Sequence, residues 1–573
     1  MRFMFIAAAI LLFKIVEATA ADNVPKQFWF FVEAEFRDRE LPGLKTDEVL
    51  ALMKRAKDAG YHGMLVSDYS FGKIPDDPML VANLARVRDK ADELGLKVVP
   101  QVMPVGASNS ILMNDNNLAE GVPVENCPLK EVDGVLEAVE GEELLLEGGF
   151  EGVSSGDLGN STFDVAGWRI DEHDKEIIRS SSVERHTGNK SLVMSDFEAG
   201  VDDYFAGRTV TLLPRRQHRM KFFVKSSDFD GQVRVLIKPR AAAGYQRILQ
   251  IERPSGEAWI ECVVTFNSLT GGEVDVTLAL DKATKGKIFF DDVELRSVGP
   301  TNLLRRDGCS IRIVHDDREL REGTDFEPWR QDYSESPGDF DINAEGPPVK
   351  LMPGSGVPEG AEVSVDYFHA EPMRFGANVL VSCCLKHPAL DDCYRKQVQA
   401  LRQLLRPDGW LLGHDEIRVA GWCQLCNEPA TTCGQLLGDN VRRCLDMVHE
   451  HGGAKPAFVW NDMFDKHFNA QDRYFLNRST FTDSWKGLKP ETRIVNWTND
   501  LCDRKASVEF LNGLGHRQVA AMYYDLEGDE LEQSTKSWRE LIRTNELIDA
   551  VLYATWEKNY DRLEEFRNYF PTP

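Results

Sequence analysis

Two adjacent carboxylates, Asp415 and Glu416, are the residues best suited to chemistry in this sequence. They follow, after His414, a short apolar run, residues 409–413, that is typical of a buried strand. Neighbouring carboxylates repel each other, which raises the pKa of one of them toward the working range of a general acid. We therefore predict that Asp415 and Glu416 are a catalytic pair of the kind that cleaves glycosidic bonds.

Carboxylates and aromatic side chains also follow other apolar runs of the chain. Sugar sites need this mixture, because carboxylates bind hydroxyl groups and aromatic rings stack on the apolar faces of sugar rings. The predicted substrate contacts are Arg37, Asp68, His414, Trp460, Asp462, Trp497, Tyr523, Asp525, Trp556 and Glu557. Acidic strand ends also serve as helix caps, and tryptophans also fill cores, so each residue alone has a purely structural alternative.

These positions converge only if the strands belong to one sheet. Residues 27–103 alternate between apolar strand-like runs and amphipathic helices, and the same rhythm resumes from about residue 373. Three early and five late strands predict a (β/α)8 TIM barrel, in which the carboxyl ends of all strands meet on one face. An open doubly wound sheet is the rival fold, but no glycine-rich phosphate loop follows the first strand.

The barrel pattern is interrupted by β-rich sequence. Short alternating runs separated by turn residues predict an inserted β-sandwich over residues 143–298, followed by a small β-rich segment over 299–372. The barrel is then split into residues 21–110 and 373–573. The two ends of the sandwich, residues 146–151 and 288–295, resemble the terminal strands of jelly-roll carbohydrate-binding modules. The alternative is a sandwich that only packs on the barrel.

The composition narrows the class of partner. The net charge of −26 opposes binding to nucleic acids and anionic membranes, and is compatible with neutral oligosaccharides or polysaccharides. Residues 1–20 have the basic start, apolar run and small-residue end of a signal peptide, which predicts a secreted or periplasmic protein. No later stretch is apolar enough to predict membrane insertion.

The chain has eleven cysteines, concentrated after residue 380. In an exported protein they are expected to form disulfides that brace a long loop. Cys423 and Cys426 form a single C-x-x-C motif without a second pair at zinc-ribbon spacing, so the sequence does not favour a metal site there. It indicates no redox or nucleotide cofactor and leaves open a structural calcium ion in the sandwich.

The strand-end residues resemble the β-N-acetylhexosaminidases, a family of glycoside hydrolases. The resemblance covers the barrel and lies in residues 413–416, with Trp460 and Asp462, Tyr523 and Asp525, and Trp556 and Glu557 following in the same order. It implies that Glu416 protonates the leaving oxygen and that Asp415 orients a substrate 2-acetamido group. It further implies that Tyr523 holds this group, that Asp525 and Glu557 bind hydroxyls, and that the tryptophans wall the pocket. His414 departs from the family, which usually has glycine at this position.

Two other functions fit the same residues. The first is a glycosidase for another sugar, in which Glu416 works with a second protein carboxylate, Asp68, Asp462 or Asp525. The second is a protein that binds glycans without cleaving them.

Overall fold

The computed structural model describes residues 23–570 with short gaps, which are residues 41, 75–76, 140, 146, 153–155, 160–161, 199–202, 241–246, 252–257, 376–377, 473 and 500. The predicted signal peptide lies outside the described residues. So does Leu146, the first residue of the segment 146–151 that resembles a terminal strand of carbohydrate-binding modules. None of the helices in the described ranges is both long and apolar enough to cross a membrane.

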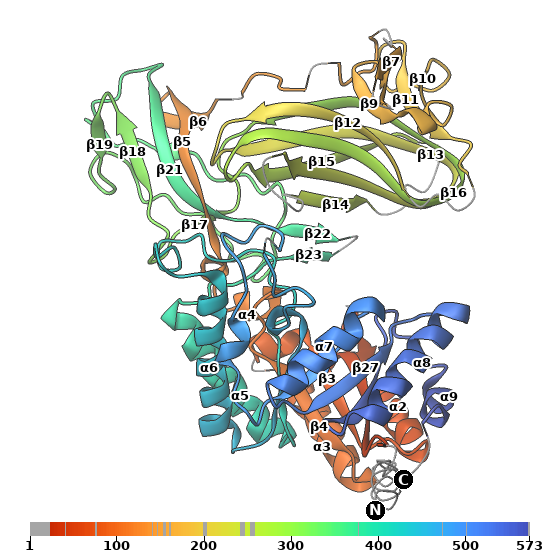
Figure 1. The fold of residues 1–573 in the computed structure, drawn as a ribbon. Coiled ribbons are helices and arrows are strands. Elements are labelled where there is room, and N and C mark those ends of the chain that lie inside the picture. Colours follow the sequence, from red (N-terminus) through yellow and green to blue (C-terminus); the bar gives the residue numbers. More distant parts are fainter. Residues whose placement is uncertain are drawn as a thin grey trace, which may run out of the picture.

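Eight parallel strands form a closed ring in the lower half of Figure 1. They are β1 (Gln27–Glu35), β3 (Gly63–Asp68), β4 (Lys97–Val102), β24 (Trp410–Leu412), β25 (Ala457–Trp460), β26 (Arg493–Asn496), β27 (Gln518–Tyr523) and β28 (Ile548–Ala554). The ring closes because β1 pairs with β28 on one side and with β3 on the other. The closure confirms a closed barrel of eight parallel strands and excludes the open sheet. A two-residue strand, β2 (Leu44–Lys45), extends β1.

Helices cover the outside of this ring (Figure 1). They are α2 (Thr46–Asp58), α3 (Pro78–Leu94), α5 (Pro388–Leu405), α6 (Cys433–Gly452), α7 (Leu501–Gly513), α8 (Gly528–Thr544) and α9 (Leu563–Asn568). Between β25 and β26 the described residues form only the 3-10 turns η4 (Asp462–Phe464) and η5 (Ser484–Gly487). This segment is rich in Asn, Asp, Ser and Thr, whose side chains favour turns over helix, so the regular strand–helix alternation is interrupted here.

Local sequence signals set the helix ends. In α3, the Asp77 carboxylate accepts hydrogen bonds from the amides of Met79 and Leu80, Pro78 occupies the first turn, and Gly95 ends the helix with a φ of 61°. In α6, Thr432 forms a capping box with Gln435. These helices therefore begin and end where the chain chemistry predicts.

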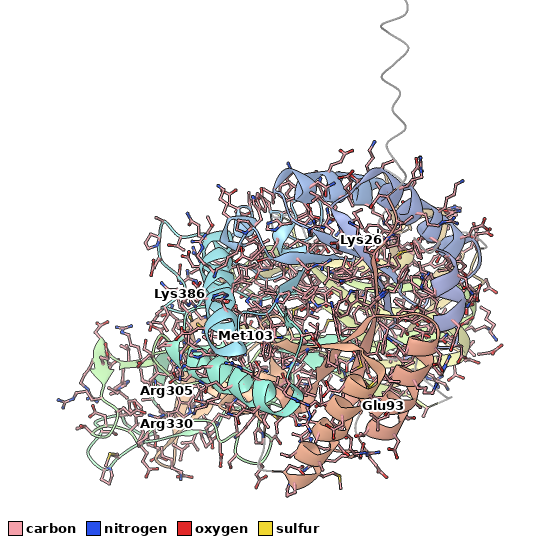
Figure 2. The ribbon with its side chains drawn as sticks, turned by 90° about the horizontal axis from the view of Figure 1, so that it is seen from below. Lys26, Glu93, Met103, Arg305, Arg330 and Lys386 are labelled. Atoms are coloured by element: carbon pink, nitrogen blue, oxygen red, sulfur yellow. The ribbon has the colours of Figure 1, made fainter. Side chains whose placement is uncertain are left out.

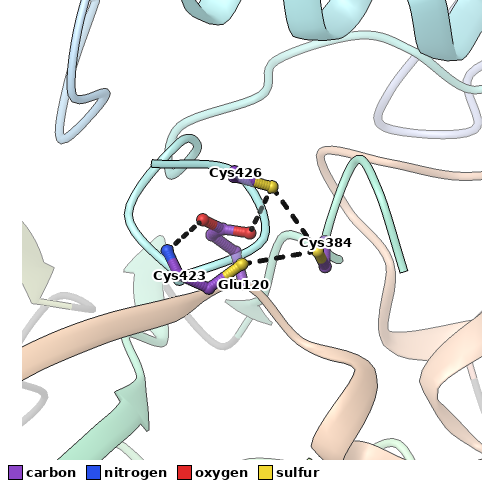
Figure 3. A group of neighbouring side chains, drawn as sticks. All are labelled: Glu120, Cys384, Cys423 and Cys426. Carbon is purple, nitrogen blue, oxygen red and sulfur yellow. Dashed lines mark hydrogen bonds between the residues drawn. The ribbon is translucent and has the colours of Figure 1, made fainter. Parts of the chain in front are cut away.

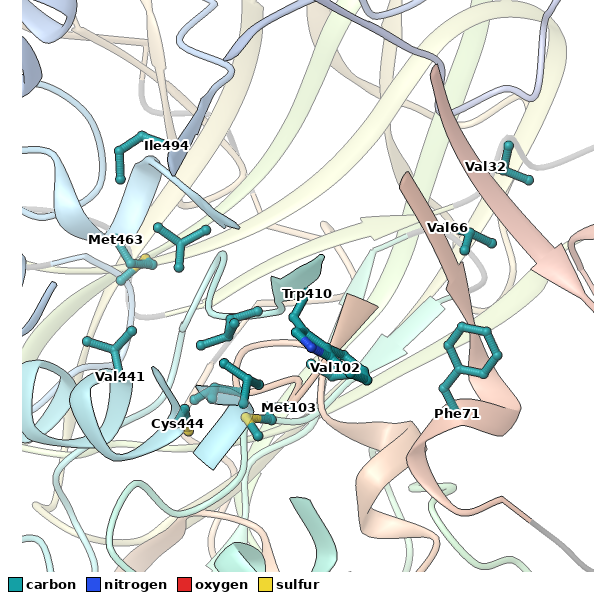
Figure 4. Close-up of a cluster of buried hydrophobic side chains, with 14 of the residues drawn as sticks. Val32, Val66, Phe71, Val102, Met103, Trp410, Val441, Cys444, Met463 and Ile494 are labelled. Carbon is teal, nitrogen blue, oxygen red and sulfur yellow. The ribbon is translucent and has the colours of Figure 1, made fainter. Parts of the chain in front are cut away.

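Alternation along the strands separates two apolar layers. Trp29 and Phe31 point into the ring and pack in its interior core, whereas Phe28 and Phe30 pack between the strands and the helices. Figure 4 shows part of the outer layer, which includes Val32. The same alternation directs Glu33, two residues after Phe31, toward the carboxyl-end mouth of the ring.

The insertion leaves the barrel after β4 and returns before α5. Its first part is a small sheet to the upper left in Figure 1. The sheet contains β5 (Gly121–Val132), β6 (Val135–Ala138), β17 (Leu303–Leu304), β18 (Arg312–His315), β19 (Arg318–Leu320), β20 (Val349–Lys350) and β21 (Glu362–Ala370). The segment predicted at 299–372 thus pairs with strands that precede the sandwich, so one insertion is nested within another. Short helices, α4 (Asn109–Leu112), η1 (Tyr69–Gly72) and η2 (Asn116–Leu118), lie near the barrel mouth.

The sandwich depends on two long antiparallel strands, β13 (Gln217–Pro239) and β16 (Gly272–Ser297). One half of this pair is flanked by β15 and β11 and the other half by β14 and β12, with register shifts between the halves. The long strands therefore pass from one layer to the other around a shared apolar core. The other strands are β7 (Gly156–Gly159), β8 (Thr162–Val165), β9 (Trp168–Asp171), β10 (Ile178–Ser181), β11 (Ser191–Ser195), β12 (Asp203–Leu212), β14 (Arg247–Ile251) and β15 (Ile260–Asn267), with the short helix η3 (Glu172–Asp174) between β9 and β10.

The return to the barrel begins later than predicted. Residues from 373 were expected to belong to the barrel, but β22 (Met373–Phe375) pairs with β14 of the sandwich and with β23 (Asn378–Leu380). Strand β22 has only three residues, so its sequence does not show whether it belongs to the barrel or to the sandwich.

In the view from below, Glu93 marks the barrel side and Arg305 and Arg330 mark the small-sheet side (Figure 2).

The interior of the ring should dominate the stability of the barrel. Leu552 is fully buried there, whereas Leu514 is 39% exposed. We expect Leu552→Ala to lower the free energy of unfolding by about 2–5 kcal/mol, because it removes buried methyl groups and leaves a cavity. The matched change Leu514→Ala should cost less than about 0.5 kcal/mol. Urea unfolding followed by tryptophan fluorescence measures both, and equal effects would contradict the assignment of the core.

Candidate active site

A cavity of about 670 Å³ lies at the carboxyl-end mouth of the barrel. Its volume is in the usual range for small-molecule sites. Of the residues predicted to contact substrate, the cavity wall brings together Asp68, Asp415, Glu416, Trp460, Trp497 and Trp556. The insertion also contributes to the wall, through Asp339 and the β23 residues 378–380. Among the described lining residues there is no lysine or arginine.

Aromatic rings form one side of the cavity. The ring centroids of Trp460 and Trp556 are 6.3 Å apart, and each packs edge-on against Phe31, at 5.7 and 5.5 Å. Trp556 is 45% exposed, so its ring is accessible to a ligand. Tyr524 lies beside Trp497 and Trp556. The indole N–H of Trp497 and the hydroxyl of Tyr524 are buried without a hydrogen-bond partner in the described structure, and polar ligand groups are suited to satisfy them.

The turn that carries the carboxylate pair is fixed by two contacts. Glu416 has a φ of 48°, an uncommon backbone conformation for a residue with a side chain. Its amide donates a hydrogen bond of 2.8 Å to the carboxylate of Asp462. Gly106 packs against the same turn, and a Cβ atom there would lie 2.0 Å from the carbonyl oxygen of Asp415. Asp462 and Gly106 therefore hold the backbone in a conformation that it would otherwise rarely adopt.

Arg418 is an important residue that the sequence argument missed. Its guanidinium lies 2.7 Å from the Glu416 carboxylate, and only 9% of its side chain is exposed. The two side chains form an ion pair beside the cavity. In the sequence, Arg418 could have been identified only because it stands two residues after the carboxylate pair.

Burial opposes ionisation of the other carboxylates. It raises the pKa of Asp415, and the nearby Glu416 charge raises it further. Burial also raises the pKa of Asp462, with a further contribution from Asp415. In Glu33, which lines the cavity, burial raises the pKa although Lys558 partly opposes this. The site thus combines an ion-paired carboxylate with neighbours that favour their protonated forms.

Asp68 lines the cavity, but its carboxylate is already occupied. One oxygen accepts a hydrogen bond from the amide of Phe36 at 2.7 Å. The other accepts from the amide of Ser70 at 2.6 Å and from its hydroxyl. Asp68 therefore joins the ends of β1 and β3, which is the structural alternative for an acidic strand end.

Three other predicted residues support the site from outside the lining. Asp462 is fully buried behind the Glu416 turn. His414 is buried, its Nε2 lies 2.9 Å from Asn440 Oδ1, and burial lowers its pKa to about 4. Asp525 accepts hydrogen bonds from the amides of Trp556 and Glu557, at 2.7 and 3.1 Å. Asp525 thereby positions the loop that carries Trp556, and Glu557 itself lies exposed on that loop.

Tyr523 and Arg37 are placed differently from the prediction. Tyr523 stacks on Tyr553, with ring centroids 4.6 Å apart, in the apolar layer between the barrel and the helices. The next residue, Tyr524, packs instead beside Trp497 and Trp556 of the cavity wall. Arg37 is ion-paired with the buried Glu35 at 3.2 Å and does not line the cavity. Their roles in substrate binding remain predictions that the geometry does not favour.

We expect the Asp462 hydrogen bond to hold the Glu416 turn. Asp462→Ala leaves a buried amide without its acceptor and should lower the free energy of unfolding by about 1–3 kcal/mol. Asp462→Asn keeps an acceptor oxygen and should retain most of this stability. Hydrogen exchange of a peptide spanning residues 413–417 should be faster in Asp462→Ala, but near wild type in Asp462→Asn and in the exposed control Asp472→Ala. Equal exchange in all variants would contradict this role.

The raised pKa of Asp415 predicts a specific pH dependence. In the unfolded chain an aspartate titrates near about 3.9, so above that pH the folded protein keeps a proton that the unfolded chain has released. Stability due to this group is therefore full at low pH and is lost as the pH rises through the folded-state pKa. Asp415→Asn removes the titration, so its unfolding midpoint relative to wild type should rise between about pH 4 and about pH 6, where the folded-state pKa lies. A constant difference would contradict the shift.

Comparison with known proteins does not assign a family. No family model and no curated protein matches this chain. Similar solved structures include "Family 16 Carbohydrate Binding Module-2", with 19% identity over 21% of this chain and 84% of that chain, and a TM-score of 0.18. Others are TmCBM61 in complex with β-1,4-galactotriose, with 16% identity over 27% and 97% of the chains and a TM-score of 0.20, and the CBM22-1 xylan-binding domain of Paenibacillus barcinonensis Xyn10C, with 14% identity over 29% and 99% and a TM-score of 0.21. Likenesses this limited establish no function, and the resemblance to hexosaminidases stays a prediction.

Proposed function

We propose that the barrel binds a neutral glycan in its cavity and hydrolyses a glycosidic bond there. The observation that carries this proposal is that Asp415 and Glu416 line the same cavity as Trp460, Trp497 and Trp556. Indole rings stack on sugar faces, and paired carboxylates supply the acid and the negative charge that glycoside hydrolysis requires. The absence of lysine and arginine from the described lining favours an uncharged substrate over a phosphorylated one.

The protonation pattern suggests how the two carboxylates share the work. Burial favours a protonated Asp415, whereas Glu416 is ion-paired with Arg418. The hexosaminidase resemblance implies the reverse, with Glu416 as the proton donor. In the ligand-free arrangement Asp415 is thus the better proton donor, and Glu416 the better group to stabilise positive charge on the sugar. Glu33, on the same cavity, is a further carboxyl with a raised pKa.

The substrate proposed first is a β-linked N-acetylhexosaminide, because the strand-end residues resemble enzymes that act on it. Of the second carboxylates considered for another mechanism, Asp68 is engaged by backbone amides, while Asp462 and Asp525 lie outside the described lining. A two-carboxylate mechanism would therefore use Glu33 rather than these residues. Glycan binding by the sandwich also remains part of the proposal, as does secretion.

The proposal predicts that Glu416→Gln and Asp415→Asn each lower kcat/KM for an aryl N-acetylhexosaminide by more than about 100-fold, because one change removes the proton donor and the other the negative charge that stabilises the sugar cation. A glycoside with a strongly activated leaving group needs no protonation, so it should restore bond cleavage only in the variant that lacks the proton donor. Rescue of Asp415→Asn would support Asp415 as the proton donor. Rescue of Glu416→Gln would support Glu416 as the donor, as the resemblance implies. Wild-type activity in both variants would refute the catalytic pair.

Glycan binding without hydrolysis is the second candidate function. The Arg418–Glu416 ion pair favours it, because a carboxylate neutralised in this way is a weaker catalyst. A glycan array and a panel of chromogenic glycosides with the full-length protein separate the two functions. Binding that Trp497→Ala weakens, with no cleavage of any bound glycan, would support a lectin-like barrel.

A further inference from the structure

Three cysteines and one glutamate meet at the loop that joins β24 to α6 (Figure 3). Glu120 immediately precedes β5, Cys384 lies between β23 and α5, and Cys423 and Cys426 lie in the loop between β24 and α6. All four side chains are buried, and their potential ligand atoms lie within 4.8 Å of one another. The C-x-x-C motif thus acquires two partners that are distant in the sequence.

The distances fit a common central ion. The Sγ atom of Cys384 lies 3.6 Å from those of both Cys423 and Cys426. Cys426 Sγ lies 3.8 Å from Glu120 Oε2. Around a tetrahedral zinc ion, two thiolates are about 3.8 Å apart, and a thiolate and a carboxylate oxygen about 3.5 Å. A disulfide would require about 2.0 Å. The described cysteines form no disulfide.

Without an ion, the cluster leaves a buried carboxylate beside thiols that stabilise it only weakly. Thiols are weak hydrogen-bond donors, so they give a buried carboxylate little compensation for lost water. One oxygen of Glu120, Oε1, is held by the amides of Trp422 and Cys423, at 2.7 and 3.0 Å. The other oxygen, Oε2, faces the thiols.

We propose that Glu120, Cys384, Cys423 and Cys426 bind one structural zinc ion. Three thiolates and a carboxylate oxygen form a closed tetrahedral set that suits this borderline-soft cation and leaves no position for substrate. On binding, each thiol releases its proton to solvent as its sulfur–zinc bond forms. The complex would carry two negative charges, and the nearby Arg306 guanidinium compensates one of them.

The position of the ion gives it a structural task. Residues 103–120 carry the chain out of the barrel and residues 381–387 bring it back, and the two segments pair between Ala119 and Cys383. Figure 2 shows Met103 and Lys386 on the same side of the molecule. The ion would fasten both segments to the loop that begins with the catalytic carboxylates. It therefore lies outside the cavity and is independent of the proposed hydrolysis.

Metal analysis of the full-length protein, purified without added chelator or reductant, tests the proposal. We expect about one zinc per chain by elemental mass spectrometry. Replacement by cobalt should produce thiolate-to-cobalt charge-transfer absorption. Removal of zinc by a strong chelator should lower the unfolding midpoint by at least about 5 °C, because the ion binds only the folded chain. Protein that binds neither zinc nor cobalt would overturn the proposal.

Matched variants locate the ion. Cys384→Ser and Cys426→Ser should each lose more than about nine-tenths of the zinc, since each removes a thiolate ligand. Cys444→Ser, which removes another buried thiol on α6, should retain it. If the ligand variants do not fold, intact mass spectrometry of the wild type still decides the matter. A mass lower by two hydrogens, mapped to a bond between any two of Cys384, Cys423 and Cys426, would overturn the zinc site.

Discussion

Closure of the eight-stranded ring is the constraint on which the site depends. The final link joins strands from opposite ends of the chain, with Phe30 paired to Tyr553 and to Met64. Since all eight strands are parallel, their carboxyl ends must meet at one rim. This requirement brings Phe31 to within 5.5 Å of the ring of Trp556, and it sets Glu33 opposite the turn of Asp415 and Glu416. If the ring were open, these side chains would belong to separate surfaces.

The nested insertion adds a second constraint, because a chain that leaves a closed barrel must return at the same place. The outgoing and returning segments consequently lie side by side, and this brings Glu120 to Cys384. The strand to which the chain returns, β24, is followed by the turn of Asp415 and Glu416 and then by the C-x-x-C motif. The topology thus concentrates the proposed zinc ligands beside the loop whose backbone needs the most support. It also brings Asp339 and the residues of β23 to the rim of the cavity.

Features encoded locally were predictable from the sequence, and features that depend on distant pairing were not. The run ending at Trp460 matches β25 because apolar side chains and the following Asn461 and Asp462 define a strand and its end. The small sheet was placed incompletely, because β5 and β21 pair across more than two hundred residues. Positive φ values at Tyr523 and Tyr524 break the strand alternation, so the sequence did not show that Tyr524 is the tyrosine beside Trp497 and Trp556. Cys384 and Glu120 carry no local pattern that links them to Cys423, so the sequence favoured disulfides.

The raised pKa values in the cavity result from burial of the carboxyl groups. Burial favours protons on Asp415 and Glu33, while Arg418 balances only Glu416. A phosphorylated or carboxylated substrate would meet these acidic groups without a lining cation to pair with. A neutral sugar meets no such penalty, since its hydroxyls can both donate to an ionised carboxylate and accept from a protonated one. The indole N–H of Trp497, which lines the cavity, offers a hydrogen bond of the same kind. In the proposed function, this acidic lining would favour uncharged polyols over anionic substrates.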